Sequence, residues 1–261
     1  MIYYDGRLLL IYYAVKYRGD YQKIMTAIEL HEEVAYEEAI KVNDSLKCKT
    51  LTYLDYDYPF KLKQVYQPPL VLFYYGDISL LHKRILGVVG SRDYSDYGKL
   101  CAEKVIEEII PGNVLISGLA RGIDTVAHDT ALKNHAQTIA VLGCGIDAPC
   151  YPPENQELLD ELKKDHLVLS EYPFDEEPDR SHFPQRNRII AGLSDALFIP
   201  QINSYMSGTM ITYSIALTLG KPIIVAPHPI DSPTINNELL HEGAIIPINR
   251  KQILYEIDWH H

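Results

Sequence analysis

From residue 86 onward, short apolar runs alternate with stretches long enough to form a helix, and this alternation limits the folds open to the chain. The apolar runs occupy residues 86–90, 114–117, 138–143, 167–170, 196–200 and 222–226. Amphipathic segments lie between them, near residues 96–110, 122–134, 154–164, 184–192 and 208–219. Continuous apolar strands separated by helices predict a parallel sheet covered on both faces. With right-handed crossovers, the pattern predicts a Rossmann-like α/β fold with a doubly wound, mostly parallel sheet.

The residues that precede this pattern have a different character. Apolar residues recur at helical spacing through the first part of the chain and predict a small N-terminal helical domain. Residues 51–80 are rich in tyrosine and proline and predict an extended connection with one strand at residues 70–74. We therefore divide the chain into a helical domain (1–50), a main domain (51–250) and a C-terminal tail (251–261).

The overall charge is unfavourable for general nucleic-acid binding. The formal net charge is −11, and bulk charge of this sign repels phosphate. Any binding of DNA therefore requires a local basic site. Residues 154–179 carry ten acidic residues against two lysines, whereas residues 180–188 carry three arginines, one histidine and no acid. The basic segment is either an ordinary solvated surface or part of such a site.

Cysteine usage and hydropathy indicate a cytoplasmic protein. Four scattered cysteines form no CxxC pair and no metal-like cluster with histidine, which fits a reducing compartment. The N-terminus has no basic region ahead of an apolar stretch, so we expect no secretory signal. No run of about 18 apolar residues is present, so we expect no membrane span.

Glycine, serine and arginine cluster where the predicted strands end, which is the edge at which doubly wound sheets bind ligands. The first strand of the alternating pattern ends in Gly90-Ser91-Arg92, and the second ends in Ser117-Gly118-Leu119-Ala120-Arg121-Gly122. A later strand leads into Ser207-Gly208-Thr209, which opens a helix. Glycines let a ligand approach backbone N–H groups, arginines supply forked donors, and a helix N-terminus adds partial positive charge. These turns predict an anion-binding rim.

Nucleotide-cofactor motifs fit the sequence poorly. Gly143-Cys144-Gly145-Ile146-Asp147-Ala148 matches a dinucleotide fingerprint in form, but the prolines at 149, 152 and 153 displace the helix that such a motif must open. No P-loop of the form G-x-x-x-x-G-K-[ST] is present. We therefore expect no cofactor and no metal.

Three polar side chains near the rim could act in catalysis or serve the fold. Asp124 and His128 lie four residues apart on one helix face. Either they form an acid–base pair, or Asp124 braces the preceding turn and His128 packs behind it. Glu171 either acts as a base or braces the arginine-rich segment. No G-x-S-x-G elbow surrounds a serine of the rim, so we expect the structural alternatives and no catalytic residue.

These motifs resemble the DprA/Smf family of DNA-processing proteins over about residues 57–248. The most specific part is the run Phe183-Pro184-Gln185-Arg186-Asn187-Arg188-Ile189-Ile190-Ala191-Gly192-Leu193-Ser194. The other matching segments occur in the family's order, at residues 87–92, 117–124, 127–128, 138–147, 151–152, 169–172 and 207–209.

The resemblance implies a Rossmann-like protein that binds single-stranded DNA without strong sequence preference, forms homodimers and loads the recombinase RecA onto DNA during natural transformation. It implies no catalytic activity. In the family, DNA lies in a basic pocket at the strand ends. The residues themselves fit this role, because arginines and backbone N–H groups can hold phosphates without reading sequence and Phe183 could stack on a base. The expected DNA- and phosphate-binding residues are Gly90, Ser91, Arg92, Ser117, Gly118, Arg121, Gly122, Phe183, Arg186, Asn187, Arg188, Ser207, Gly208 and Thr209.

Two other hypotheses remain open. One is a nucleotide-binding or nucleotide-hydrolysing protein related to the LOG-type phosphoribohydrolases, and the other is a nucleotide-sensing scaffold. The LOG-type enzymes carry a P-G-G-x-G-T loop near a catalytic glutamate, whereas the comparable segment here, Met206–Met210, has no acid in the following turn. The chain also departs from the DprA/Smf pattern in two loops, at Pro200-Gln201-Ile202 and at Pro227-His228-Pro229.

Overall fold

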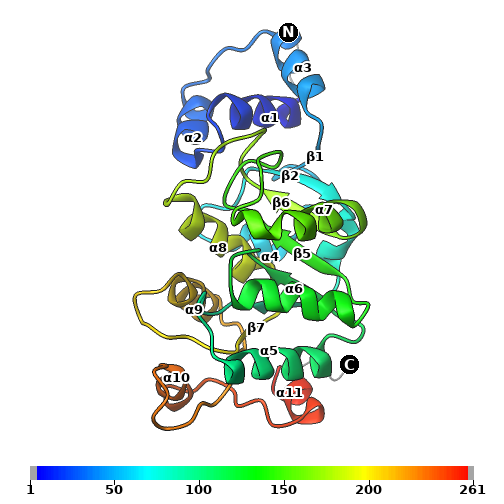
Figure 1. Cartoon of the computed structure of the whole chain (residues 1–261). Helices are drawn as coiled ribbons and strands as arrows, with labels where there is room; N and C mark the ends of the chain where they lie inside the picture. The colour runs from blue at the N-terminus through cyan, green and yellow to red at the C-terminus, as the bar shows by residue number, and fades with distance from the viewer. Residues whose placement is uncertain (1–4, 258–261) are drawn as a thin grey trace.

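The computed structural model describes residues 5–257, which form an elongated molecule around one eight-stranded sheet (Figure 1). The strand order is β1-β2-β6-β5-β4-β3-β7-β8. Strands β3 to β8 pair in parallel, whereas β1 and β2 form an antiparallel extension at one edge. The strand bounds are β1 Lys49–Thr52, β2 Val71–Gly76, β3 Ile85–Val88, β4 Val114–Ser117, β5 Thr138–Val141, β6 Leu167–Ser170, β7 Ala196–Ile199 and β8 Ile223–Val225. The predicted doubly wound, mostly parallel sheet is confirmed.

Helices cover both faces of the sheet because neighbouring residues of each buried strand point to opposite sides. Leu86 packs into an apolar cluster with α5 and α6, whereas its neighbour Ile85 packs into the cluster that holds α8 and α9. The helices that follow the strands are α5 Asp96–Ile109, α6 Ile123–Lys133, α7 Gln156–Asp165, α8 His182–Leu193 and α9 Gly208–Thr218. These bounds agree within two residues with the helices expected from the apolar periodicity.

The N-terminal segment is helical, as its periodicity predicts. It forms α1 Gly6–Lys16, α2 Tyr21–Glu29 and α3 Tyr36–Ser45, which lie at one end of the molecule beyond β1 and β2 (Figure 1). Buried side chains of α1, including Ile11, share an apolar cluster with Phe73 of β2. The division at residue 50 stays a prediction, and residues 1–4 and 258–261 of the predicted terminal segments lie outside the described residues.

Several short elements were not expected from the sequence. Strand β1 was missed because two of its four residues, Lys49 and Thr50, are exposed or half-buried, and only pairing with β2 makes it a strand. Three short helices, α4 Phe60–Lys63, η1 Ile78–His82 and α10 Asn236–His241, and the 3₁₀ turn η2 Pro153–Asn155 are also local features. Helix α11, Arg250–Glu256, lies in the predicted tail and buries Ile253 in the cluster beneath α5. Each is too short for periodicity to identify.

Within residues 5–257, no helix has both the length and the apolar character needed to cross a bilayer. The same residues contain no group of three or more histidine, cysteine or acidic side chains placed to hold a metal ion.

Gly76, at the end of β2, provides a test of how closely the antiparallel edge is packed. Its φ is +94°, and a Cβ atom there would lie 1.9 Å from the carbonyl oxygen of His166. We expect Gly76→Ala to lower the free energy of unfolding by at least about 2 kcal/mol, because it adds a steric clash to an unfavourable backbone conformation. Urea unfolding followed by circular dichroism measures this loss.

Gly220 is the matched control, since its φ is +66° and no described atom lies within 4 Å of its Cβ position. We expect Gly220→Ala to cost about 1 kcal/mol, from backbone strain alone. Equal losses in the two variants would contradict close packing at Gly76.

Candidate functional site

A pocket opens at the carboxyl ends of the strands, at the point where the strand order reverses. Strand β3 lies between β4 and β7, so the chain runs outward in one direction through β4 to β6 and then returns to β7 and β8. The loops after β3 and β7 therefore diverge and leave a crevice between them. The first turns of α8 close its third side.

This strand-end pocket has a volume of about 390 Å³. It is lined by Val89, Gly90, Ser91, Arg92, Asp93, Ala120, Asp124, Phe183, Arg186, Asn187, Asn203, Ser204, Ser207, Gly208, Thr209 and Thr212. Most of the predicted binding residues therefore meet in one place, although they come from three separate parts of the chain.

Arg186 is a buried cation in the wall of the strand-end pocket. Only 5% of the residue is exposed. Its Nη1 donates to the carbonyl oxygens of Gly118 and of Val141, the latter at 2.7 Å. Its Nε has no hydrogen-bond partner among residues 5–257. A buried guanidinium with an unpaired N–H favours an anion in the adjacent space.

The close approach of Arg186 to the end of β4 requires glycine at position 118. A Cβ atom on Gly118 would lie 1.9 Å from Arg186 Nη1. The turn that follows is braced by Asp124, whose carboxylate accepts from the backbone N–H groups of Gly118 at 3.2 Å and Ala120 at 3.3 Å. Burial raises the pKa of the Asp124 carboxyl, and the Arg186 guanidinium opposes that rise. Asp124 therefore braces the turn, as the structural alternative predicts.

His128 does not form an acid–base pair with Asp124. Its Nδ1 lies 2.8 Å from Thr138 Oγ1, and the side chain is fully buried. Burial lowers the pKa of His128 to about 3, so the imidazole is neutral at physiological pH. The residue packs behind the turn and contributes to the fold rather than to the pocket.

Arg92 and Phe183 form the exposed side of the strand-end pocket. The Arg92 guanidinium carbon lies 6.0 Å from the centre of the Phe183 ring, and Phe183 lies 5.8 Å from the ring of Tyr151. Tyr151 is 51% exposed. A planar ligand group could stack on these rings while Arg92 binds an adjacent negative charge.

The N-terminus of α9 supplies the opposite wall. Ser207 caps this helix, since its side chain accepts from the N–H of Met210. Asn187 Nδ2 donates to the carbonyl oxygen of Gly208 at 3.1 Å and ties α8 to α9. Backbone N–H groups and the dipole of an 11-residue helix therefore face the same space as Arg186.

A hydrogen-bonded network joins the loops after β3 and β7. The N–H of Ser91 donates to the carbonyl oxygen of Gln201 at 2.9 Å, and the N–H of Asn203 donates to Ser91 Oγ at 3.0 Å. Gln201 Oε1 accepts from the N–H of Ser95, and its amide nitrogen donates to Asn203. Gln201 is one of the departures from the DprA/Smf pattern, and here it holds the two loops together.

Five predicted binding residues lie outside the strand-end pocket. Ser117 is fully buried and donates to the carbonyl oxygen of Val88, and Gly118 lies beneath Arg186. Arg121 and Gly122 line a neighbouring hollow of about 270 Å³, where Arg121 pairs with Glu154 at 2.6 Å. The fifth, Arg188, faces away from the pocket.

Arg188 forms a buried bidentate ion pair with Glu171. Its Nη1 lies 2.5 Å from Glu171 Oε2, and its Nη2 lies 2.7 Å from Oε1. The two side chains are 7% and 8% exposed, and Arg188 Nε donates to the carbonyl oxygen of Gln67. These contacts differ from the expectation that Arg188 binds phosphate, because its donors are bound within the protein in this structure. Glu171 braces the arginine-rich segment, as one of its two sequence-based interpretations predicts.

Tyr151, Asp93, Asn203 and Ser204 were not among the predicted site residues. Asp93, Asn203 and Ser204 line the pocket, and Tyr151 contacts Phe183. All four lie in loops that follow strands, and this position could have identified them from the sequence. Ligand-binding residues of doubly wound sheets lie in these loops.

Comparison with known proteins links this chain to one family. The family model described as DNA recombination-mediator protein A matches residues 49–258. DNA processing protein DprA of Streptococcus pneumoniae is 40% identical over 215 residues, which cover 82% of this chain and 76% of that protein. DNA processing protein DprA of Bacillus subtilis is 41% identical over 191 residues, which cover 72% of this chain and 64% of that protein. The chain thus spans about two thirds to three quarters of these relatives.

Two solved structures share the fold. The X-ray structure of DprA from Streptococcus pneumoniae matches with a TM-score of 0.81 at 32% identity and covers 95% of each chain. The structure of DprA from Helicobacter pylori, which concerns a single-stranded DNA binding mode, matches with a TM-score of 0.74 at 30% identity. That match covers 83% of this chain and 99% of the Helicobacter pylori chain.

The Arg188–Glu171 pair yields a stability prediction. We expect Glu171→Gln to lower the free energy of unfolding by about 3 kcal/mol or more, because it leaves a buried guanidinium without a compensating charge. Urea unfolding measures the loss. Glu103→Gln is the control, since it removes a carboxylate from a surface pair with Lys99 at 3.9 Å and should change stability by less than about 0.5 kcal/mol. A loss in Glu171→Gln as small as that of the control would contradict a structural role for the pair.

Proposed function

Because this chain belongs to the DNA recombination-mediator protein A family, we propose that it binds single-stranded DNA without strong sequence preference through the strand-end pocket. The observation that carries the proposal is Arg186, a buried guanidinium in the wall of an open pocket, whose Nε finds no hydrogen-bond partner within residues 5–257. A backbone phosphate brought into this pocket supplies the missing negative charge. The single-stranded DNA binding mode described for Helicobacter pylori DprA, which shares the fold, supports the same ligand.

The chemistry of the pocket favours phosphate contacts over the reading of base sequence. Arg92, Arg186 and the N-terminus of α9 donate to anionic oxygens, which every nucleotide offers equally. Phe183 and Tyr151 offer ring faces on which any base can stack. Bases are free to stack in this way only when they are unpaired, so we expect single strands to bind more tightly than duplexes.

The acidic body of the molecule restricts binding to this local site. With a net charge of −11, the protein repels phosphates away from the pocket. Binding should therefore depend on very few arginines, and the slope of log K against log salt should be shallow, at about 0.7 for each phosphate contact. This reconciles an acidic protein with a nucleic-acid ligand.

The family description and the names of the relatives support a proposal about the role of the chain in the cell. We propose that the chain acts as a homodimer in the cytoplasm, loads RecA onto single-stranded DNA and serves natural transformation and recombination. Support comes from the family description as a recombination mediator and from the name DNA processing protein carried by the Streptococcus pneumoniae and Bacillus subtilis relatives. RecA filament formation on DNA coated with single-strand-binding protein, measured with and without this chain, tests the loading step.

We propose binding, not catalysis, as the activity of the pocket. Asp124 accepts from two backbone N–H groups of the turn, and Glu171 is paired with Arg188, so each carboxylate has a structural role that accounts for its position. Incubation of the purified protein with AMP tests the hydrolase alternative, and release of free adenine would support that alternative against the proposal.

Arg92 gives the direct test of the DNA site. We expect Arg92→Ala to weaken binding of an oligo-dT strand about ten-fold and to reduce the slope of log K against log salt by about 0.7, because one phosphate contact is lost. Fluorescence anisotropy across a salt series measures both quantities. Lys104→Ala, on the exposed side of α5, removes the same charge outside the pocket and should leave both nearly unchanged. Matching losses in the two variants would show that only net charge matters.

Glu154 gives a test in which the substitution is expected to strengthen DNA binding rather than weaken it. Its carboxylate holds Arg121 in an exposed ion pair, so a phosphate must compete with it for that guanidinium. We expect Glu154→Gln to strengthen oligo-dT binding about two- to three-fold and to steepen its salt dependence, provided that DNA extends to Arg121. Glu157→Gln, one turn further on at an exposed site, is the charge-matched control. Equal affinities in the two variants would place Arg121 outside the DNA path.

A further inference from the structure

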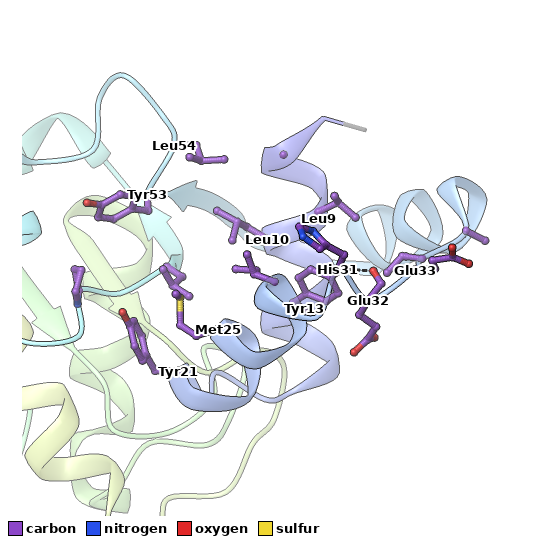
Figure 2. A pocket seen from close by; sticks show the side chains of 16 residues that line it. Leu9, Leu10, Tyr13, Tyr21, Met25, His31, Glu32, Glu33, Tyr53 and Leu54 are labelled. Carbon is purple, nitrogen blue, oxygen red and sulfur yellow. Dashed lines mark hydrogen bonds between the residues drawn. The ribbon is translucent and has the colours of Figure 1, made fainter. Parts of the chain in front are cut away.

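A second, larger hollow lies at the other side of the molecule, between the N-terminal helices and the antiparallel edge of the sheet. We call it the interdomain groove, and its volume is about 1190 Å³. Helices α1 and α2 form one wall, and the loops after β1 and before β2 form the other (Figure 2). None of the residues that line the strand-end pocket lines this groove.

The floor of the interdomain groove is apolar. Figure 2 shows Leu9, Leu10 and Met25 among the side chains that face it, and Leu54 borders it from the opposite wall. Leu54 is 60% exposed, and the same loop continues to Tyr56, which is fully exposed. Exposed apolar side chains that line a hollow offer a surface on which the apolar side chains of a partner can pack.

The rim of the groove near the end of α2 is acidic. Residues 29–38 carry five glutamates and no lysine or arginine. Glu32 is paired with Lys16, and Glu38 accepts from Tyr12. Glu29, Glu33 and Glu37 are exposed and form no ion pair with any residue of the described chain, 5–257. Glu33 lines the groove itself (Figure 2).

The backbone hydrogen bonding of the groove walls indicates which secondary structure a bound segment adopts. The lining residues of α1 and α2 belong to helices whose backbone groups are bonded internally, so this wall offers side chains rather than a row of free N–H and C=O groups. Such a wall receives the apolar face of a helix, whereas an added strand needs an open ladder of backbone groups.

We propose that the interdomain groove docks an amphipathic helix of a partner protein, with aliphatic anchors on one face and lysine or arginine beside them. The aliphatic anchors fill the floor around Leu9, Met25 and Leu54, and a basic side chain pairs with Glu33, which lines the groove. Glu29 and Glu37, four residues away in the sequence on either side, add to the negative charge of this part of the chain. Charge complementarity with this unpaired rim is the reason for a basic partner. This interaction is independent of the DNA site.

The probe is a synthetic amphipathic peptide of about 15 residues, with leucine at helical spacing and lysine at the other positions. A peptide of the same pattern with glutamate in place of lysine is the control. Fluorescence anisotropy with the full chain should give binding at least about ten-fold tighter for the leucine–lysine peptide. Equal affinity for the two peptides would overturn the proposed basic partner.

Variants locate the contact. We expect Glu33→Lys to weaken binding of the leucine–lysine peptide about five-fold, and the exposed Leu54→Gln to weaken it to a similar degree. Glu256→Lys changes the net charge equally but lies on α11, at the opposite end of the molecule (Figure 1). Binding that falls equally in Glu33→Lys and Glu256→Lys would overturn the proposal, as would unchanged binding in Leu54→Gln.

Two further measurements distinguish a partner helix from other possible occupants of the groove. Sedimentation velocity of the unmodified chain and of Leu54→Gln tests a second copy: a lower mass for the variant would make the groove a self-interface and overturn the proposal. Binding of the apolar dye ANS that the leucine–lysine peptide fails to displace would indicate a small-molecule site and would overturn it too. Far-UV circular dichroism of each variant checks that the fold is retained.

Discussion

The burial of Arg186 between the ends of two parallel strands is the interaction on which the strand-end pocket depends. Its guanidinium donates to carbonyl oxygens at the end of β5 and just after β4, so it joins α8 to the sheet. A charged group in this position is costly unless its donors are satisfied and a negative charge is near. Asp124 supplies part of that charge, and the open pocket leaves room for a ligand to supply more.

Arg188 anchors the same helix from another side. Its ion pair with Glu171 connects α8 to the end of β6, and its contact with Gln67 connects α8 to the segment before β2. With two buried arginines bound to different strands, the first turns of α8 are held at a defined position. Phe183 and Asn187 therefore reach the pocket in a preorganised arrangement, which reduces the entropy that these side chains lose when a ligand binds.

Much of the fold could be predicted because its strands are buried on both faces. Continuous apolar runs such as 114–117 and 167–170 have few other solutions in a chain of this length. The turn at residues 118–122, which contains two glycines, lies at the edge where such sheets bind ligands. Strand β1 could not be predicted, since Lys49–Thr52 carries too few apolar residues and depends on its register with β2. The interdomain groove was also beyond prediction, because it exists only where separate segments meet.

The sequence by itself determined the alternation of strands and helices, the glycine-containing turns at the edge where doubly wound sheets bind ligands, and the basic character of residues 180–188. Only the tertiary structure decided which arginine lines the pocket at that edge. Arg186 and Arg188 are two residues apart, and two residues on a helix are separated by about 200° of rotation. One side chain therefore turns toward the strand-end pocket and the other toward Glu171. The residues around Arg186 and Arg188 do not indicate which of the two lines the pocket. The positions of β4, β5 and β6 around α8 decide it.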